Sequence, residues 1–202
     1  GVVSGGDLDI YDWIGFAFPL GTEHYWFATA YLVMYLFGPF LAAGIQKMKK
    51  RELQTFMALL LVFFSLEKTI LPVYLATDRY GYDFGWFLCL FVVAGYIRLY
   101  GISWLEKRSH AVGAYVLSCL FIWLFALCSN TIGSEIETFV HYANMLYTYN
   151  HLLCLTGAVS LFYVFKNLRI GEGRFAGAVR KLAPYTFGVY LLHEHILVRN
   201  EW

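Results

Sequence analysis

The chain has 202 residues, of which 59% are hydrophobic, 20% aromatic and 14% charged. A soluble domain has about 25% charged residues, so this composition excludes an ordinary soluble fold and favours a membrane protein. The 15 Lys and Arg residues nearly balance 14 Asp and Glu residues, and we therefore expect no nucleic-acid partner.

Apolar runs alternate with polar loops along the chain. A helix needs about 20 apolar residues to cross the hydrocarbon core of a bilayer. The predicted membrane spans are 25–45, 53–77, 84–100, 111–128, 145–165 and 184–198. The predicted fold class is therefore all-α, a polytopic transmembrane helical bundle of about six spans that form a single integral membrane domain.

The loops between these spans alternate in charge. Lys and Arg cluster at 47–51, 98–108 and 166–181, whereas the loop at 129–144 has neither residue. Because loops rich in Lys and Arg stay on the cytoplasmic side, we predict that residues 1–24 lie on the outer side. The chain begins without an initiator Met, and we expect further helices at both ends in a longer parent protein.

The segment 172–183 has helical periodicity. Its apolar residues Phe175, Val179 and Leu182 recur at i, i+4 and i+7, and basic residues lie off that stripe. This pattern predicts a short helix in the cytoplasmic membrane interface. An ordinary connecting loop remains the alternative.

Several polar or aromatic residues inside the spans are candidates for a binding site. Glu67 and Lys68 interrupt the second span, and two interpretations are open. The two side chains line a hydrated cavity, or the span consists of two shorter pieces broken near Pro72. Arg98, at the cytoplasmic end of its span, is a positive-inside anchor or a phosphate contact.

The first and last spans hold the remaining candidates. Tyr25, Trp26 and Tyr31 open the first span, where an aromatic belt with ordinary packing is the simpler interpretation. In the last span Tyr190 and His193 share one helical stripe, whereas Glu194 and His195 point elsewhere.

Standard catalytic signatures are absent from the sequence. It contains no GxSxG, HExxH, P-loop or GxGxxG motif. None of the four cysteines forms a CxxC pair, so we expect no metal. From the residues alone the prediction stops at a polytopic membrane protein with a polar interior.

Three stretches together resemble one family. EHYWFATAYLVMYLFGPFL, FLCLFVVAGYIRLYG and LAPYTFGVYLLHEHILVR are similar to helices of the bacterial acyltransferase-3 membrane proteins, in particular the branch that O-acetylates cell-surface polysaccharides. The resemblance implies a multi-pass enzyme of the bacterial cytoplasmic (inner) membrane, with about ten helices. It would transfer an acyl group, usually acetyl, from acyl-CoA to a carbohydrate hydroxyl.

The resemblance also implies roles for individual residues. His193 and Tyr190 match the family's YLxH helix, and Tyr25, Trp26 and Tyr31 match its aromatic helix, so we expect them on the acceptor side of the site, with His193 as the candidate catalytic residue. Glu67 is a further candidate there. The family's Arg and His on its first helix have no counterpart in this sequence, and we expect the chain alone to be inactive.

Arg98 is a candidate contact for the phosphates of CoA, from its charge and predicted side only. The expected partners are membrane lipids and a carbohydrate acceptor.

Two other classes of protein remain open. A transporter or flippase for a lipid-linked saccharide would use Glu67, Lys68 and His193 to line a pathway. An unrelated membrane-bound O-acyltransferase fold would also place a His within the membrane. An Arg followed by a His on an upstream helix would favour the acyltransferase-3 interpretation.

Overall fold

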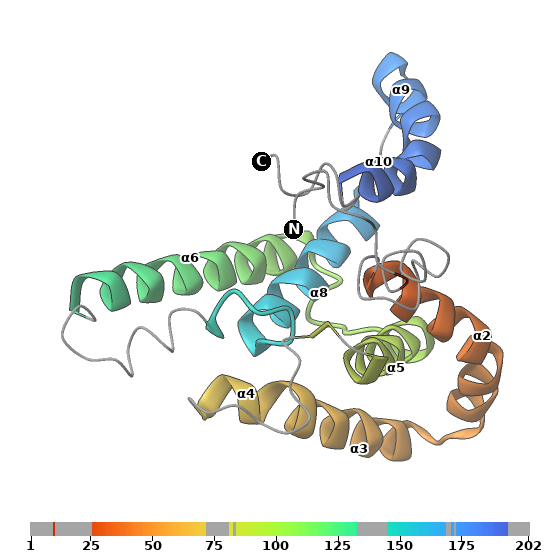
Figure 1. Cartoon of the computed structure of the whole chain (residues 1–202), viewed down its shortest axis with the longest axis horizontal. Helices are drawn as coiled ribbons and strands as arrows, with labels where there is room; N and C mark the ends of the chain where they lie inside the picture. Colours follow the sequence, from red (N-terminus) through yellow and green to blue (C-terminus); the bar gives the residue numbers. More distant parts are fainter. Residues whose placement is uncertain are drawn as a thin grey trace. The chain divides into compact units, whose positions relative to one another are not determined.

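The computed structural model describes residues 10, 26–71, 81–82, 84–132, 145–168, 171 and 173–193, and every regular element among them is helical (Figure 1). The helices are α2 (Trp26–Lys47), α3 (Lys50–Leu61), α4 (Glu67–Ile70), α5 (Phe84–Tyr100), α6 (Arg108–Ile132), α8 (Leu152–Lys166), α9 (Arg174–Leu182) and α10 (Thr186–His193). A π-helical turn, Val62–Leu66, joins α3 to α4, and a 3₁₀ turn, Ala183–Tyr185, joins α9 to α10.

The lengths of these helices fit a membrane. Phe27–Lys47, Lys50–Ile70 and Arg108–Ser129 are each long and apolar enough to cross a bilayer, and α5 and α8 are shorter apolar helices. The predicted fold class, an all-α membrane protein, is confirmed.

Some helix boundaries differ from the predicted spans. The second helical stretch ends at Ile70 rather than at 77, because Leu71 takes an extended conformation (φ −96°, ψ 121°). The residue before a proline is driven out of the helical region, and Pro72 follows Leu71. α8 begins at Leu152 rather than at 145, after a turn in which the Thr148 hydroxyl donates to Met145 O at 2.7 Å.

The chain divides into two compact units, Gly1–Leu32 with Arg169–Trp202, and Val33–Leu168. In the second unit α5 lies at the centre of the packing. Ile45, Leu53 and Val92 form one buried cluster that joins α2, α3 and α5. Trp86, Cys89 and Leu155 form another that joins α5 to α8.

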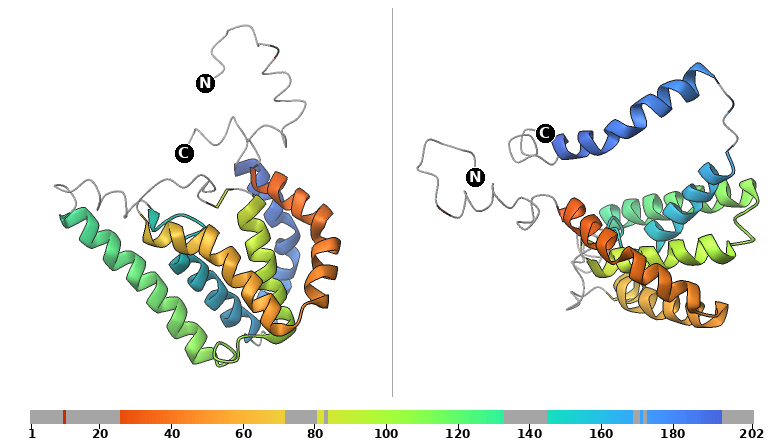
Figure 2. Two further views of the ribbon diagram at one scale, coloured as in Figure 1. Left: turned by 90° about the horizontal axis from the view of Figure 1, so that it is seen from below. Right: turned by 90° about the vertical axis from the view of Figure 1, so that its right-hand side faces the viewer.

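α6 and α8 pack along each other through small residues, and they lie side by side in both views of Figure 2. Gly157 and Ser160 of α8 are buried, as is Ser118 of α6. A Cβ added at Gly157 would lie 3.6 Å from Ser118 Cβ. Small residues let two membrane helices approach closely, and this stripe accounts for the contact.

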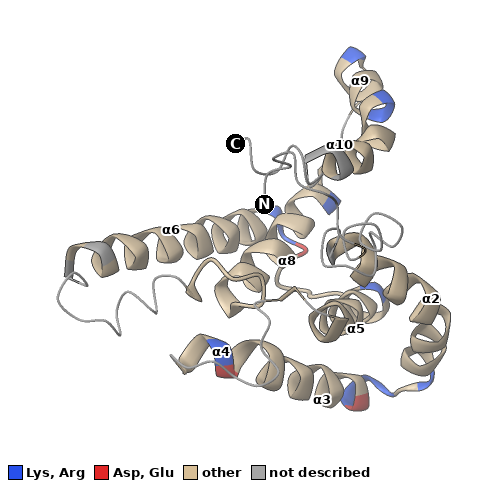
Figure 3. Cartoon of the chain, viewed as in Figure 1, with Lys and Arg blue, Asp and Glu red and all other residues tan. Residues whose placement is uncertain are grey.

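One end of the second unit gathers the basic segments (Figure 3). Here the start of α3 meets the end of α5: Gln54 Nε2 donates to Tyr96 Oη at 3.0 Å, and Lys50 Nζ lies 5.4 Å from the Tyr100 ring centroid. We call this the basic end.

The loop after α5 is fastened to the end of α8 at the same place. Ile102 N donates to the fully buried Tyr163 Oη at 2.7 Å, and Lys166 pairs with Glu106 at 2.6 Å. The predicted basic segments 47–51 and 98–108, together with Lys166, are therefore at one end of this unit.

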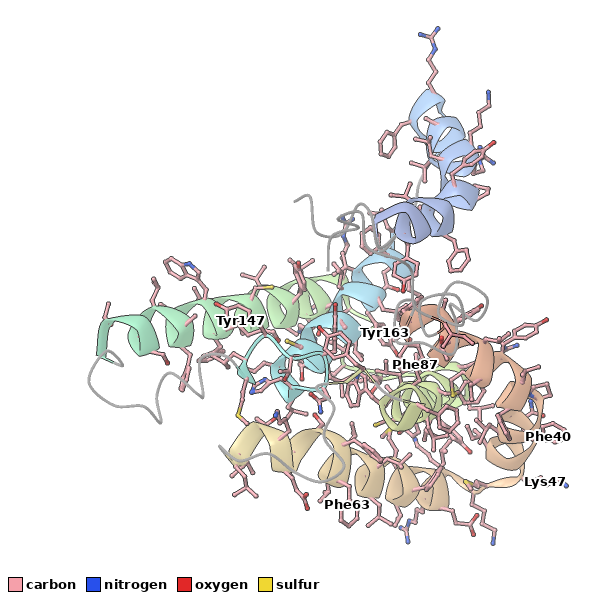
Figure 4. All side chains as sticks on the ribbon, in the orientation of Figure 1. Phe40, Lys47, Phe63, Phe87, Tyr147 and Tyr163 are labelled. Atoms are coloured by element: carbon pink, nitrogen blue, oxygen red, sulfur yellow. The ribbon has the colours of Figure 1, made fainter. Side chains whose placement is uncertain are left out.

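Many large apolar side chains on the helices of the second unit face outward. Phe40 and Phe63 are 76% and 56% exposed and point away from the helices in Figure 4, whereas Tyr163 lies among them. Because lipid tails cover such surfaces, their exposure is expected of a membrane protein.

The first unit contains the start of α2 together with α9 and α10. No residue of α9 is buried, and its predicted apolar stripe, Phe175, Val179 and Leu182, is exposed. The helix begins at Arg174 and ends at Leu182, within the predicted segment 172–183. Its location in the membrane interface stays a prediction.

Candidate functional site

Aromatic side chains of the first unit form a chain of ring contacts. Phe27 stacks with Tyr31, with ring centroids 6.3 Å apart, and meets Tyr190 of α10 edge-on at 5.3 Å. Tyr190 in turn stacks with Phe187 at 6.0 Å. We call these residues the aromatic cluster. It brings together two predicted substrate-binding residues, Tyr31 and Tyr190, through Phe27, which the sequence analysis did not single out.

The aromatic cluster is partly open. Tyr31 is 56% exposed, and Tyr190 is half-buried. Aromatic faces pack against the apolar faces of a ligand, while a phenol hydroxyl donates or accepts hydrogen bonds. This combination of flat apolar rings and polar tips is typical of small-molecule sites.

The other candidates of the first and last spans are only partly described. His193 is the last residue of α10, three positions after Tyr190, and Trp26 is the first residue of α2. The side chains of both residues, and the whole of Tyr25, Glu194 and His195, lie outside the described part of the chain. Their roles stay predictions.

A second group of polar residues lies in the second unit, at the end opposite the basic end. It consists of Ser65, Lys68, Thr69, Asn150 and His151, and we call it the polar junction. Ser65 and Lys68 are 0% and 1% exposed, and Asn150 and His151 are each 4% exposed. Polar and ionisable groups so deeply buried in a membrane protein are costly and are characteristic of functional sites.

The π-helical turn explains how these residues meet. A π turn breaks the regular i→i−4 hydrogen bonding of the helix. Phe64 O accepts from Asn150 Nδ2 at 3.0 Å, and Ser65 O accepts from Thr69 Oγ1 at 2.8 Å. Thr69 Oγ1 also accepts from Leu152 N at 3.0 Å. The turn therefore fastens α4 to the start of α8.

His151 caps α8 and is held in one tautomer. Its Nδ1 accepts from Leu153 N at 3.2 Å, so a neutral ring carries its proton on Nε2, which is then a donor. Lys68 directly precedes Thr69, whose hydroxyl accepts from Leu152 N, the residue after His151, so the two residues lie on segments that are hydrogen-bonded to each other. His151 falls within the predicted span 145–165 but was not among the predicted site residues, and the structure places it as the N-cap at the start of α8.

The remaining predicted site residues lie at opposite ends of the second unit. Glu67 is half-buried in α4, next to the polar junction, and Arg98 is exposed near the end of α5, at the basic end. α5, which carries Arg98, ends at Tyr100, and the next residue, Gly101, has a φ of +65° that suits glycine. Gly101 N donates to Ile97 O at 2.9 Å and closes the helix end. Within the described residues, no three His, Cys, Asp or Glu side chains are placed to hold a metal ion.

Long apolar helices, basic segments gathered at one end and polar side chains buried at the other define a polytopic membrane protein. A model of the acyltransferase-3 family, described as an acyltransferase domain, matches residues 2–198, and the chain belongs to this family. No curated protein and no solved structure matches it. Membership of the acyltransferase-3 family supports a membrane acyltransferase in general. It also argues against the alternative that the chain is an unrelated membrane-bound O-acyltransferase.

Proposed function

We propose that the protein transfers an acyl group, in the first place acetyl, from acyl-CoA to a hydroxyl group of a cell-surface carbohydrate. The observation that carries the proposal is the match of the acyltransferase-3 family over residues 2–198. In this reaction the acceptor oxygen forms an ester bond with the acyl carbon, the thioester C–S bond breaks, and the hydroxyl proton ends on the CoA thiolate.

The proposed membrane sidedness follows from the charges. The protein lies in the bacterial cytoplasmic membrane, and the basic end faces the cytoplasm because Lys and Arg stay on that side. Arg98 is exposed there, together with Lys49, Lys50 and Lys107. Guanidinium and ammonium groups bind phosphates by charge-assisted hydrogen bonds, which supports a role for this end in binding the CoA nucleotide.

The aromatic cluster supports a role for α10 in the reaction. Acyl transfer needs a group to accept the hydroxyl proton and donors that stabilise the oxyanion. His193 follows Tyr190 on α10, and Tyr190 contacts Phe27 of the helix that carries Tyr31. We assign Tyr31, Tyr190 and His193, with Tyr25 and Trp26, to the wall that holds the acceptor.

Replacement of His193 tests the assignment in the full-length protein. His193→Ala is expected to lower the rate of acetyl transfer at least about tenfold, because a hydrogen bond to the reacting group contributes about 1–2 kcal/mol. The measurement is transfer of radiolabel from acetyl-CoA to alkali-treated surface polysaccharide of the producing strain, in isolated membranes.

The control is Phe121→Ala. Phe121 is 58% exposed midway along α6, away from both ends of the second unit, and its replacement is expected to leave transfer within about twofold. Equal rates for His193→Ala and wild type would remove His193 from the site.

A further inference from the structure

The apolar stripe of α9 is open to its surroundings along its whole length. Its side chains Phe175, Val179 and Leu182 are 75%, 44% and 65% exposed. Because an α-helix has about 3.6 residues per turn, the three positions fall within an arc of roughly 60° on one face of the helix. A row of large apolar side chains gains free energy when an apolar medium covers it.

Basic side chains flank this stripe on both sides. Arg174, Arg180 and Lys181 are exposed. They lie roughly 105–135° around the helix from the centre of the stripe. α9 contains no Asp or Glu (Figure 3). The aliphatic stems of Arg and Lys follow an apolar surface while their charged ends stay in water, so the helix can lie flat with its stripe among acyl chains and its charges among headgroups.

The junction between α9 and α10 has the composition of a membrane interface. The 3₁₀ turn Ala183–Tyr185 joins the two helices, and Thr186 Oγ1 donates to Ala183 O at 2.8 Å. Tyr185 is 69% exposed, and tyrosine is enriched at the level of the headgroups. α10 then carries no Lys, Arg, Asp or Glu, and its residue Val189 is 63% exposed. The chain therefore changes from a charged helix to an apolar one at this turn, as expected where it enters the bilayer.

We propose that α9 binds the surface of an anionic phospholipid leaflet, with its apolar stripe at the acyl-chain boundary and its three basic side chains on the phosphate headgroups. Charge complementarity identifies the lipid, because the nine residues of α9 include three cations and no anion. Each Lys or Arg near an anionic membrane surface strengthens binding about fivefold, so the three together contribute on the order of a hundredfold. This interaction is with the membrane and does not depend on the acyl-transfer reaction.

The direct test is hydrogen–deuterium exchange of the α9 amides, measured by mass spectrometry on the full-length protein in two kinds of nanodisc. One contains phosphatidylcholine alone, and the other contains an equal mixture of phosphatidylcholine and phosphatidylglycerol. A nine-residue helix is marginal in water by itself, so its amides exchange quickly unless the helix is docked. Exchange is expected to be at least about tenfold slower in the anionic nanodisc than in the neutral one.

Removal of the three charges tests the role of the headgroups. The triple variant with Arg174→Gln, Arg180→Gln and Lys181→Gln keeps good helix formers at each position. In the anionic nanodisc its α9 amides are expected to exchange as fast as those of wild type in the neutral nanodisc, because the attraction to the headgroups is lost.

The matched control removes the same number of charges from the second unit. It combines Lys47→Gln, Arg51→Gln and Arg108→Gln, at positions that are all exposed, and is expected to leave the exchange of α9 unchanged. An equal loss of protection in the two triple variants would overturn a specific role of α9.

Phe175→Ser tests the apolar stripe. This variant is expected to raise the exchange of α9 at least about tenfold in the anionic nanodisc, because a large buried side chain is lost. Ala178→Ser is its control, since Ala178 is exposed and lies outside the stripe, and is expected to exchange like wild type.

The wild-type comparison decides between lipid and other covers of the stripe. Slow exchange in both nanodiscs would mean that a protein segment covers α9, and fast exchange in both would mean that nothing does. Either result would overturn the proposal. Exchange of the α5 amides in the same samples verifies that each variant is folded.

Discussion

Gly81 shows how one residue fixes the geometry of the polar junction. Its φ is +85°, a conformation that residues with a Cβ rarely adopt. Its neighbours approach so closely that a methyl group would overlap Tyr149 Cβ. Both the backbone conformation and the contact therefore require glycine.

Gly81→Ala is expected to destabilise the protein by about 2–4 kcal/mol, from left-handed backbone strain and overpacking together. The measurement is thermal unfolding of the purified full-length protein, followed by intrinsic fluorescence.

Gly113→Ala is the matched control, since nothing lies within 4 Å of the added Cβ in α6. It is expected to be neutral or to stabilise by up to about 1 kcal/mol. Similar losses for the two variants would show that Gly81 is not packed as described.

Individual candidate residues can be picked out from the sequence only where the signal is local, and their roles stay predictions. Tyr31 and Tyr190 were predicted from motifs on their own helices, but their connection through Phe27 is a tertiary contact. His151 is visible in the sequence as a polar residue within an apolar run. Its place in the polar junction depends on the packing of α4 against the start of α8, where Leu152 N donates to Thr69 Oγ1.

At the scale of elements, the contact between α6 and α8 depends on small side chains. Gly157 is buried where α8 meets α6, and the nearest atom to an added Cβ is Ser118 Cβ at 3.6 Å. This distance leaves room for one methyl group but not for a branched side chain. The interface between α6 and α8 is thus set by residue size.

Gly157→Leu is expected to destabilise the protein by about 1–3 kcal/mol through overpacking, whereas Gly157→Ala is expected to be tolerated. Thermal unfolding of the purified protein measures both changes. Ala158→Leu is the control, because Ala158 is the next residue of α8 and is exposed. A loss in Ala158→Leu as large as that in Gly157→Leu would contradict an effect specific to the interface.

Helix boundaries were predictable where the sequence marks them with a cap. α5 has the expected bounds, Phe84–Tyr100, because the apolar run stops at Gly101 with its positive φ. The span predicted to reach 77 ends at Ile70. The apolar run continues beyond this point, but Pro72 forces the residue before it out of the helical conformation. The π-helical turn has no comparable mark in the sequence.

At the scale of the whole molecule, we propose that CoA binds on the side of the basic end and the carbohydrate on the other side of the membrane. In the second unit the basic end carries Arg98, and the opposite end carries the polar junction. The alternation of basic and non-basic loops predicted that the segments 47–51 and 98–108 lie on one side, and the structure places both at the basic end. The residues that face each other at either end could be known only from the packing.

The most direct test of this division is acetyl transfer in proteoliposomes that contain the full-length protein in known orientation. Labelled acetyl-CoA is supplied on one side of the membrane, and alkali-treated polysaccharide on the other. We predict transfer when acetyl-CoA is on the side of the basic end and polysaccharide is on the opposite side, and little transfer when the two are exchanged. Equal transfer in both arrangements, or none in either, would contradict the account.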